Sequence, residues 1–119
     1  MTIAPALSPA IAAGDLLFLS GQLAFGDDGA IVAPDDVARQ TEQVMANIAR
    51  VLAAHGLALA DIVKTTVWLT DTADFAAFNA AYAQALGTHR PARSTVRADL
   101  MLPGARVEIE AIARRISGE

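Results

Sequence analysis

The segment from Arg106 to Ile112 alternates between apolar and polar side chains with a period of two. This pattern is typical of a β-strand with two different faces, so it restricts the fold to one that contains a sheet. The two faces of the predicted strand are Val107, Ile109 and Ala111 on one side, and Glu108, Glu110 and Ile112 on the other. Because an unpaired buried carboxylate is costly, the second face needs water, a counter-ion or a ligand.

Apolar periodicity divides the remaining chain into helices and strands. Stripes at helical spacing predict helices over 37–52 and 75–86, with Asp or Thr at their starts and glycine at their ends. Further strands are predicted over 15–20, 62–69, 92–99 and 106–114. The turn sequence 26–29 predicts that 30–32 returns as the second arm of a hairpin. Residues 1–13 are mostly apolar and contain two prolines, and we interpret them as an arm or a short edge strand.

The predicted order is therefore β-β-α-β-α-β-β, an α+β fold in which one domain spans residues 1–119. Two helices cannot cover both faces of such a sheet. We expect both helices on one face and a neighbouring subunit against the other. Hydrophobic residues make up 54% of the chain, which also favours an oligomer.

Composition excludes several classes of function. A net charge of −4 argues against a nucleic-acid partner. The sequence has no stretch long enough to cross a membrane and no signal peptide, so we expect a cytoplasmic protein without a membrane partner. With no cysteine, and with His55 and His89 lacking metal-ligand spacing, no metal or cofactor is expected. The arginines nevertheless cluster near Arg90, Arg93 and Arg97, which leaves local anion binding open.

Arg93 and Glu108 are the strongest candidates for chemistry. A guanidinium matches a carboxylate in a bidentate geometry, so Arg93 suits capture of a small organic acid. The alternative is a structural salt bridge from Arg93 to Glu108 or Glu110. One of these carboxylates could hold or activate a water as a general base. The alternative for them is a solvated strand face or an ion pair between subunits.

Polar residues elsewhere allow two interpretations each. Asn79 and Tyr82 share a helix face and could line a polar pocket, although Tyr82 could equally be a core residue with its hydroxyl satisfied. Ser20 and Gly21 end the first long strand. The glycine there permits close approach of a ligand, or marks a bend.

Taken together, several runs resemble one known family. They occur in family order: Ser20-Gly21-Gln22, Val63-Lys64-Thr65-Thr66-Val67, Asp74-Phe75 with Asn79 and Tyr82, Arg90-Pro91-Ala92-Arg93-Ser94, and Val107-Glu108-Ile109-Glu110-Ala111-Ile112-Ala113. From about Asp15 to Arg115 the chain resembles the Rid family, also called the YjgF/YER057c/UK114 family of reactive-intermediate deaminases.

The resemblance implies a chorismate-mutase-like α+β fold and a homotrimer with a ligand cleft at each subunit interface. It also implies hydrolysis of 2-imino or enamino acids to 2-keto acids and ammonia, without metal or cofactor. On this resemblance Arg93 binds the substrate carboxylate and Glu108 orients water. The backbone near Ser20, Gly21 and Thr95 contacts the ligand, and Asn79 supports the pocket.

Two positions depart from the family pattern. Leu7 stands where the best-characterised imine deaminases have a tyrosine that lines the cleft, and Thr95 stands where the family often has cysteine. Retention of Arg93 favours a carboxylate ligand, whereas the lost tyrosine opens alternatives. These are a deaminase of another small carboxylate, such as an aminomuconate-like compound, and a non-catalytic ligand-binding or chaperone-like protein.

Overall fold

The computed structural model of the chain describes residues 5–115. Its elements are β1 (Ala10–Ala13), β2 (Leu16–Gln22), α1 (Val37–Ala53), β3 (Ile62–Leu69), α2 (Phe75–Leu86), β4 (Ala92–Arg97) and β5 (Val107–Arg114), with short 3-10 turns at Leu59–Asp61 and Thr72–Asp74. The strands form one five-stranded sheet in the order β1-β2-β5-β3-β4. Among neighbouring strands of this sheet, only β3 and β4 pair in parallel, so the sheet is mixed. The predicted α+β class and element order are confirmed.

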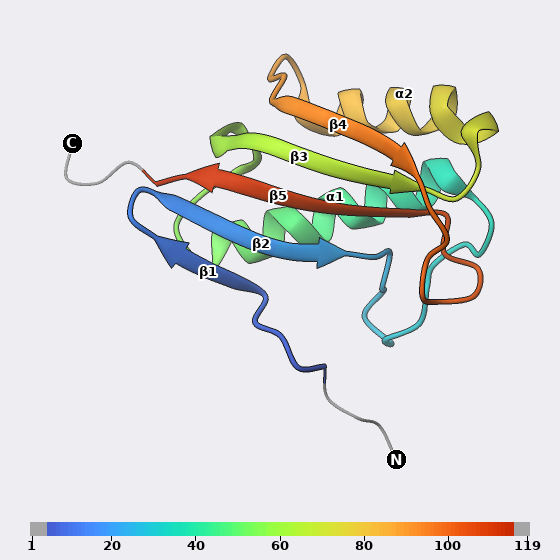
Figure 1. Cartoon of the computed structure of the whole chain (residues 1–119), viewed down its shortest axis with the longest axis horizontal. Helices are drawn as coiled ribbons and strands as arrows, with labels where there is room; N and C mark the ends of the chain where they lie inside the picture. Colours follow the sequence, from blue (N-terminus) through green and yellow to red (C-terminus); the bar gives the residue numbers. More distant parts are fainter. Residues whose placement is uncertain (1–4, 116–119) are drawn as a thin grey trace.

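Both helices cover the same face of this sheet, as Figure 1 shows with α1 and α2 behind the strands. The topology explains this. Helix α1 connects β2 to β3, and α2 connects β3 to β4, so both crossovers step in the same direction across the sheet. Because crossovers between parallel strands are almost always right-handed, two such steps place both helices on one side.

The core lies between the helices and the inward-facing side chains of the strands. Helix α1 starts at its N-cap Asp36, whose side chain accepts a hydrogen bond of 3.1 Å from the backbone N–H of Arg39. Its buried stripe contacts β2 and β5. The apolar part of that stripe is Val37, Val44, Met45, Ile48 and Leu52. None of the helices within residues 5–115 has the length and apolar character needed to cross a bilayer.

The first hairpin differs from the prediction. The turn at 26–29 forms, with Gly26 N–H donating to the Ala30 carbonyl at 2.9 Å. However, residues 30–32 contribute only an isolated bridge between Phe25 and Ile31 and are not a strand of the sheet. The partner of β2 is instead β1, within the predicted arm, whose residues 1–4 lie outside the described part. A two-residue loop, Gly14 and Asp15, joins β1 to β2, with Gly14 at a φ of 59°.

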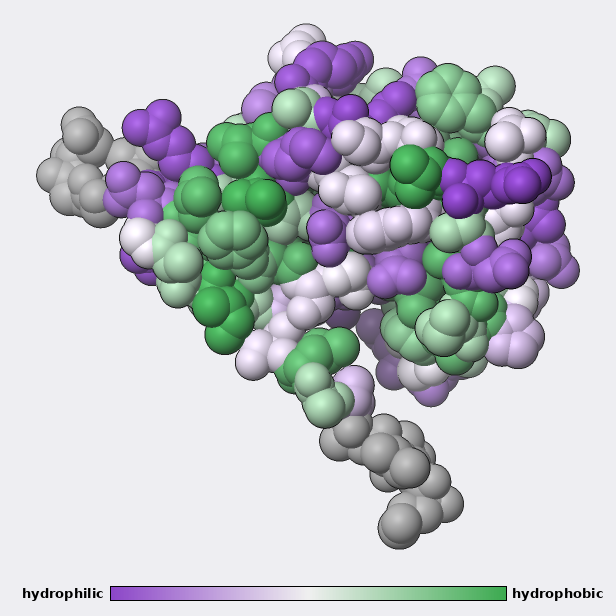
Figure 2. All heavy atoms as spheres, viewed as in Figure 1, coloured by the Kyte–Doolittle hydropathy of each residue, from purple (hydrophilic) through white to green (hydrophobic). Residues whose placement is uncertain are grey.

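The face of the sheet opposite the helices is open and partly apolar. Figure 2 shows green, hydrophobic side chains gathered over β1 and β2 on this face. Ile11 and Phe18, which are paired across β1 and β2, are 58% and 42% exposed, and Ile112 lies next to Phe18 on β5. Monomeric proteins rarely expose such contiguous apolar surface.

Candidate functional site

Arg93 is held at the outer edge of the sheet on the helix side. Its register partner on β3 is Thr65, which is fully buried beneath α2. The Arg93 guanidinium donates a hydrogen bond of 2.9 Å from Nη1 to Oδ1 of Asn79. It also lies over three aromatic rings of α2, at 5.7, 5.4 and 5.0 Å from the centroids of Phe75, Phe78 and Tyr82. These contacts fix the cation without neutralising it, which suits capture of an anion.

Tyr82 and Asn79, on the helix face beneath Arg93, have different roles. Tyr82 is 4% exposed, and its hydroxyl forms a hydrogen bond of 2.7 Å with Oγ1 of Thr65. The interpretation of Tyr82 as a core residue with a satisfied hydroxyl is therefore confirmed. Asn79 is exposed and uses its carbonyl to orient Arg93. Asn79 and Tyr82, which were predicted to share a helix face, both contact the Arg93 guanidinium.

Thr95 follows Arg93 on the same face of β4 and lines a pocket of about 190 Å³. The other lining residues are Leu69, Thr72, Phe75, Val96 and Arg97. The Thr95 hydroxyl is buried and has no hydrogen-bond partner within residues 5–115. A buried hydroxyl without a partner is uncommon in proteins, so this atom is available to a ligand that enters the pocket.

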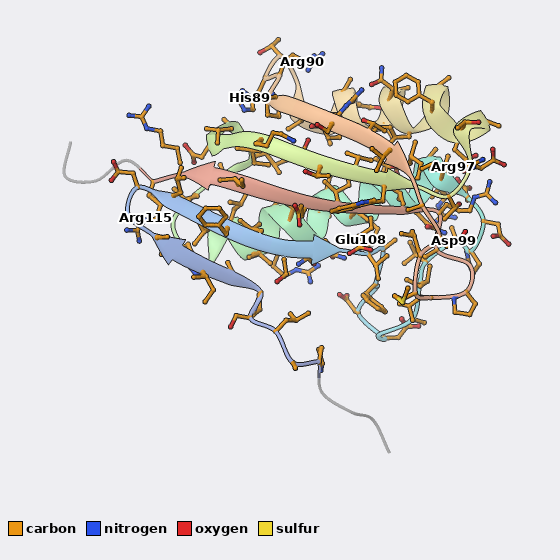
Figure 3. The ribbon with its side chains drawn as sticks, viewed as in Figure 1. His89, Arg90, Arg97, Asp99, Glu108 and Arg115 are labelled. Carbon is orange, nitrogen blue, oxygen red and sulfur yellow. The ribbon has the colours of Figure 1, made fainter. Side chains whose placement is uncertain are left out.

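Glu108 lies on β5 and projects from the open face of the sheet, beside Trp68 of β3 (Figure 3). It lines a second pocket of about 240 Å³ with Trp68 and residues 98–101 of the β4–β5 loop. Burial raises the pKa of the Glu108 carboxyl above its ordinary value, and the nearby charge of Glu110 raises it further. A carboxyl with a raised pKa can exchange protons closer to neutral pH.

Gly21 belongs to a bulge between β2 and β5 and lies directly against Glu108. A Cβ atom at position 21 would contact Oε2 of the Glu108 carboxylate, so glycine there allows the carboxylate to lie against the backbone. Ser20 donates from its hydroxyl to the Ser8 carbonyl at 2.7 Å, which fixes the preceding segment beside the end of β2. Leu7, adjacent to that segment, is 59% exposed.

The predicted site residues therefore form two groups on opposite faces of the sheet. Arg93, Asn79 and Thr95 lie on the helix side at the β4 edge. Ser20, Gly21 and Glu108 lie at the open face, where Glu108 shares a register position with Trp68. The alternative of a salt bridge from Arg93 to Glu108 or Glu110 is wrong within this chain, because no such ion pair exists in residues 5–115.

Two features of the site were not predicted from the sequence. One is the pair of rings, Phe75 and Phe78, that lie beneath the Arg93 guanidinium and were predicted only to pack in the core. The other is the position of Arg97 on the same face of β4. The period of two along β4 already placed Arg93, Thr95 and Arg97 on one face, and that signal was available.

The two histidines each form a hydrogen bond with a backbone carbonyl: His55 with that of Val51 at 3.0 Å and His89 with that of Ile62 at 2.7 Å. In the part of the chain that the structure describes, no cluster of three His, Asp or Glu residues could hold a metal.

A larger concavity of about 460 Å³ lies elsewhere, between the outer surfaces of α1 and α2. It is lined mainly by alanine, with Met45 and Leu59 and with the polar side chains of Glu42 and Gln84. It contains neither of the two groups described above. Convergent charged and polar groups identify a site better than volume does, so the candidate site is at β4 and β5.

Comparison with known proteins defines the class. Residues 1–115 match the protein family described as Endoribonuclease L-PSP. The chain is 41% identical over 106 residues to Reactive Intermediate Deaminase A, chloroplastic, of Arabidopsis thaliana, covering 89% of this chain and 57% of that protein. The crystal structure of E. coli TdcF with bound serine superposes with a TM-score of 0.86 at 35% identity, covering 97% of this chain and 91% of that one.

A Mycobacterium tuberculosis member of the YjgF/YER057c/UK114 family also superposes, with a TM-score of 0.79 at 35% identity over 91% of this chain and 86% of that one. The chain belongs to this family, the Rid or Endoribonuclease L-PSP family, as its sequence motifs indicated.

Proposed function

We propose that the protein hydrolyses reactive 2-imino or enamino acids to 2-keto acids and ammonia. The observation that carries the proposal is the Arg93 guanidinium, held by Asn79 and the rings of α2 with N–H groups left for a ligand. Support comes from the homologous Arabidopsis protein, which is named a reactive intermediate deaminase, and from the serine bound in TdcF, since serine is a small amino acid with a carboxylate.

Glu108 supplies the proton transfers in this proposal. An imine carbon is already electrophilic, so positioning of water is the main task. Glu108 takes a proton from the attacking water as its oxygen bonds to the imine carbon. The proton then goes to nitrogen and gives an aminoalcohol. The proton of its hydroxyl group next moves to nitrogen through Glu108 as the C–N bond breaks, so that ammonia leaves and the oxygen remains as the keto group. The raised pKa of Glu108 suits a group that must both accept and return a proton.

The site in this proposal is shared between subunits of a homotrimer. Arg93 and Glu108 lie on opposite faces of one sheet, so the β4 edge of one subunit must meet the open face of the next to bring them together. The exposed apolar side chains of Ile11 and Phe18 on the open face would be covered by that contact. Each subunit then contributes to two sites.

Leu7 supports a second candidate substrate class for the same chemistry. It is exposed beside the Ser20 end of β2 and offers no hydroxyl. A cleft with Leu7 there is more apolar than one with tyrosine, which favours a larger unsaturated substrate such as an aminomuconate-like amino acid. A binding or chaperone-like role keeps the same anion site but no turnover.

The test is an assay in which an amino-acid oxidase generates 2-iminopropanoate or 2-iminobutanoate and semicarbazide traps the imine that survives. The wild-type protein should accelerate imine loss. Arg93→Ala should reduce kcat/KM by at least about tenfold, because a charge-assisted contact to the substrate is lost. Arg90→Ala is the matched control. Arg90 is exposed, and within residues 5–115 its side chain donates only to the carbonyls of Gly87 and His89, so its variant should retain the wild-type rate.

Sedimentation should show the same oligomer for both variants. A wild-type rate in Arg93→Ala would reject Arg93 as the carboxylate-binding residue. If the wild-type protein binds small carboxylates but accelerates neither imine nor larger unsaturated amino acids, the binding role replaces the enzymatic one.

A further inference from the structure

Two arginines lie on the same face of β4, on either side of Thr95. Arg93, Thr95 and Arg97 alternate with outward-facing residues along the strand, and their register partners on β3 are Thr65, Val67 and Leu69, all buried on the helix side. Figure 3 shows Arg97 at the end of β4 that is farther from His89 and Arg90. The proposed hydrolysis uses Arg93 and gives no role to Arg97.

The pocket of about 190 Å³ is lined by Arg97 and lies next to Arg93, with which it shares Phe75. Phe75 lines this pocket and also contacts the Arg93 guanidinium, whose Cζ lies 5.7 Å from the ring centroid. Arg97 lines the same pocket, between the Thr72 and Thr95 side chains and the apolar surfaces of Leu69 and Val96. A ligand carboxylate at Arg93 would therefore direct its carbon chain along Phe75, past the unpartnered Thr95 hydroxyl and toward Arg97.

Arg97 is free to bind a second anion. It forms no ion pair or side-chain hydrogen bond within residues 5–115. Asp71 and Asp74 adjoin the pocket residues Thr72 and Phe75, and both are engaged elsewhere. Asp74 pairs with Arg106 at 2.9 Å, and Asp71 lies 3.9 Å from the same guanidinium. Asp99, two residues after Arg97, lines the pocket of Glu108 instead. An exposed cation beside a buried, unpaired hydroxyl is an arrangement suited to a carboxylate.

We propose that Arg97 is a specificity-determining residue that selects substrates with a second carboxylate, namely dicarboxylic 2-imino or enamino acids. This inference rests on the proposed function for its reactive group. The Cα atoms of residues 93 and 97 are about 13 Å apart along the strand. The Arg93 guanidinium is held over Phe75, and Phe75 also lines the pocket of Arg97, so a flexible Arg97 side chain that leans along this ring brings the two guanidinium groups closer together than their Cα atoms.

The inference is tested first by binding of unreactive ligands, measured by calorimetry. Glutarate and butyrate differ mainly in the second carboxylate. Wild type should prefer glutarate. Arg97→Gln should weaken glutarate binding by about tenfold, the loss of one charge-assisted contact, and leave butyrate binding unchanged. Arg39→Gln removes an equally exposed arginine on α1 and should change neither ligand.

Equal affinity of wild type for the two ligands, or a parallel loss of both in Arg97→Gln, would overturn the inference. The oxidase assay with 2-iminoglutarate and 2-iminobutanoate separates it from the proposed function. A glutarate preference that depends on Arg97, without hydrolysis of any imine, rejects the deaminase and keeps the dicarboxylate site. Hydrolysis of both imines with the same preference in wild type and Arg97→Gln keeps the deaminase and rejects the role of Arg97.

Discussion

Gly21 connects the local backbone to the proposed proton-transfer group. Its backbone passes so close to Glu108 that an added Cβ would contact Oε2 and lie 3.2 Å from the carboxyl carbon. Glu108 is half-buried between this backbone and Trp68. A side chain at position 21 must therefore displace the carboxylate.

Gly21→Ala should destabilise the fold by about 1 kcal/mol, at the low end of the usual cost of overpacking, because the contacted atoms are the end of the flexible Glu108 side chain; urea unfolding measures this cost. The cost should fall sharply in a Glu108→Ala background, because the contacted group is then absent. It should persist in a Glu110→Ala background, since Glu110 faces the same side but is exposed and does not meet Gly21. An equal cost in all three backgrounds would show that the glycine is needed for another reason.

The proposed roles of Arg93 and Glu108 follow from residue type and from the family resemblance, and they stay predictions, whereas the separation of the two residues on opposite faces could not be predicted. Alternation along each strand shows which residues share a face, as with Arg93, Thr95 and Arg97. It does not show which of the two faces packs on the helices. That choice depends on the registers that pair Thr65 with Arg93 and Trp68 with Glu108. These registers are set by contacts far apart in the sequence.

At the scale of elements, Gln40 joins α1 to the two loops that enter and leave the sheet. Its side chain is fully buried. The amide nitrogen donates to the carbonyls of Ala33 and Gly104 at 3.1 and 2.8 Å, and the amide oxygen accepts from the N–H of Arg106 at 2.8 Å. Through these bonds α1 fixes the start of β5, the strand that carries Glu108.

Gln40→Leu should cost about 2–4 kcal/mol in free energy of unfolding, because it leaves buried backbone groups without partners. Gln84→Leu, on the exposed side of α2, is the matched control and should stay within about 0.5 kcal/mol of wild type. Chemical denaturation of both variants gives the comparison. A Gln40→Leu protein as stable as the control would mean that water or a shifted loop replaces these bonds.

The predicted hairpin arm at 30–32, which is not a strand of the sheet, illustrates what local patterns can and cannot decide. The Gly26–Gly29 turn and the Gly14–Asp15 loop are both hairpin signals, and the first is the stronger because it has two glycines and two aspartates. Both turns form. Only Ala10–Ala13 continues along the free edge of β2, since the chain after Val32 must leave the sheet to start α1 at Val37. The path of the chain toward α1 therefore decides which of the two turns pairs a strand with β2.

At the scale of the molecule, each of the two pockets assigned to the proposed chemistry holds only part of the proposed site. One holds Thr95 and Arg97 beside Arg93 at the β4 edge, and the other holds Glu108 on the open face. A homotrimer built by a repeated edge-to-face contact would join one pocket of each kind at every interface. A subunit with a mutation in one of its two pockets would then still contribute its other, intact pocket to a neighbouring site.

Complementation between inactive subunits tests this arrangement. Arg93→Ala and Glu108→Ala trimers should each be inactive toward the oxidase-generated imine. In a random equimolar mixture, about three quarters of the trimers contain both kinds of subunit, and each such trimer retains about one intact site in three. Co-expression or co-refolding should therefore restore about one quarter of the wild-type rate, whereas mixing folded trimers without exchange should restore none. Sites built within single subunits would give no recovery under either condition, because every subunit lacks one of the two groups.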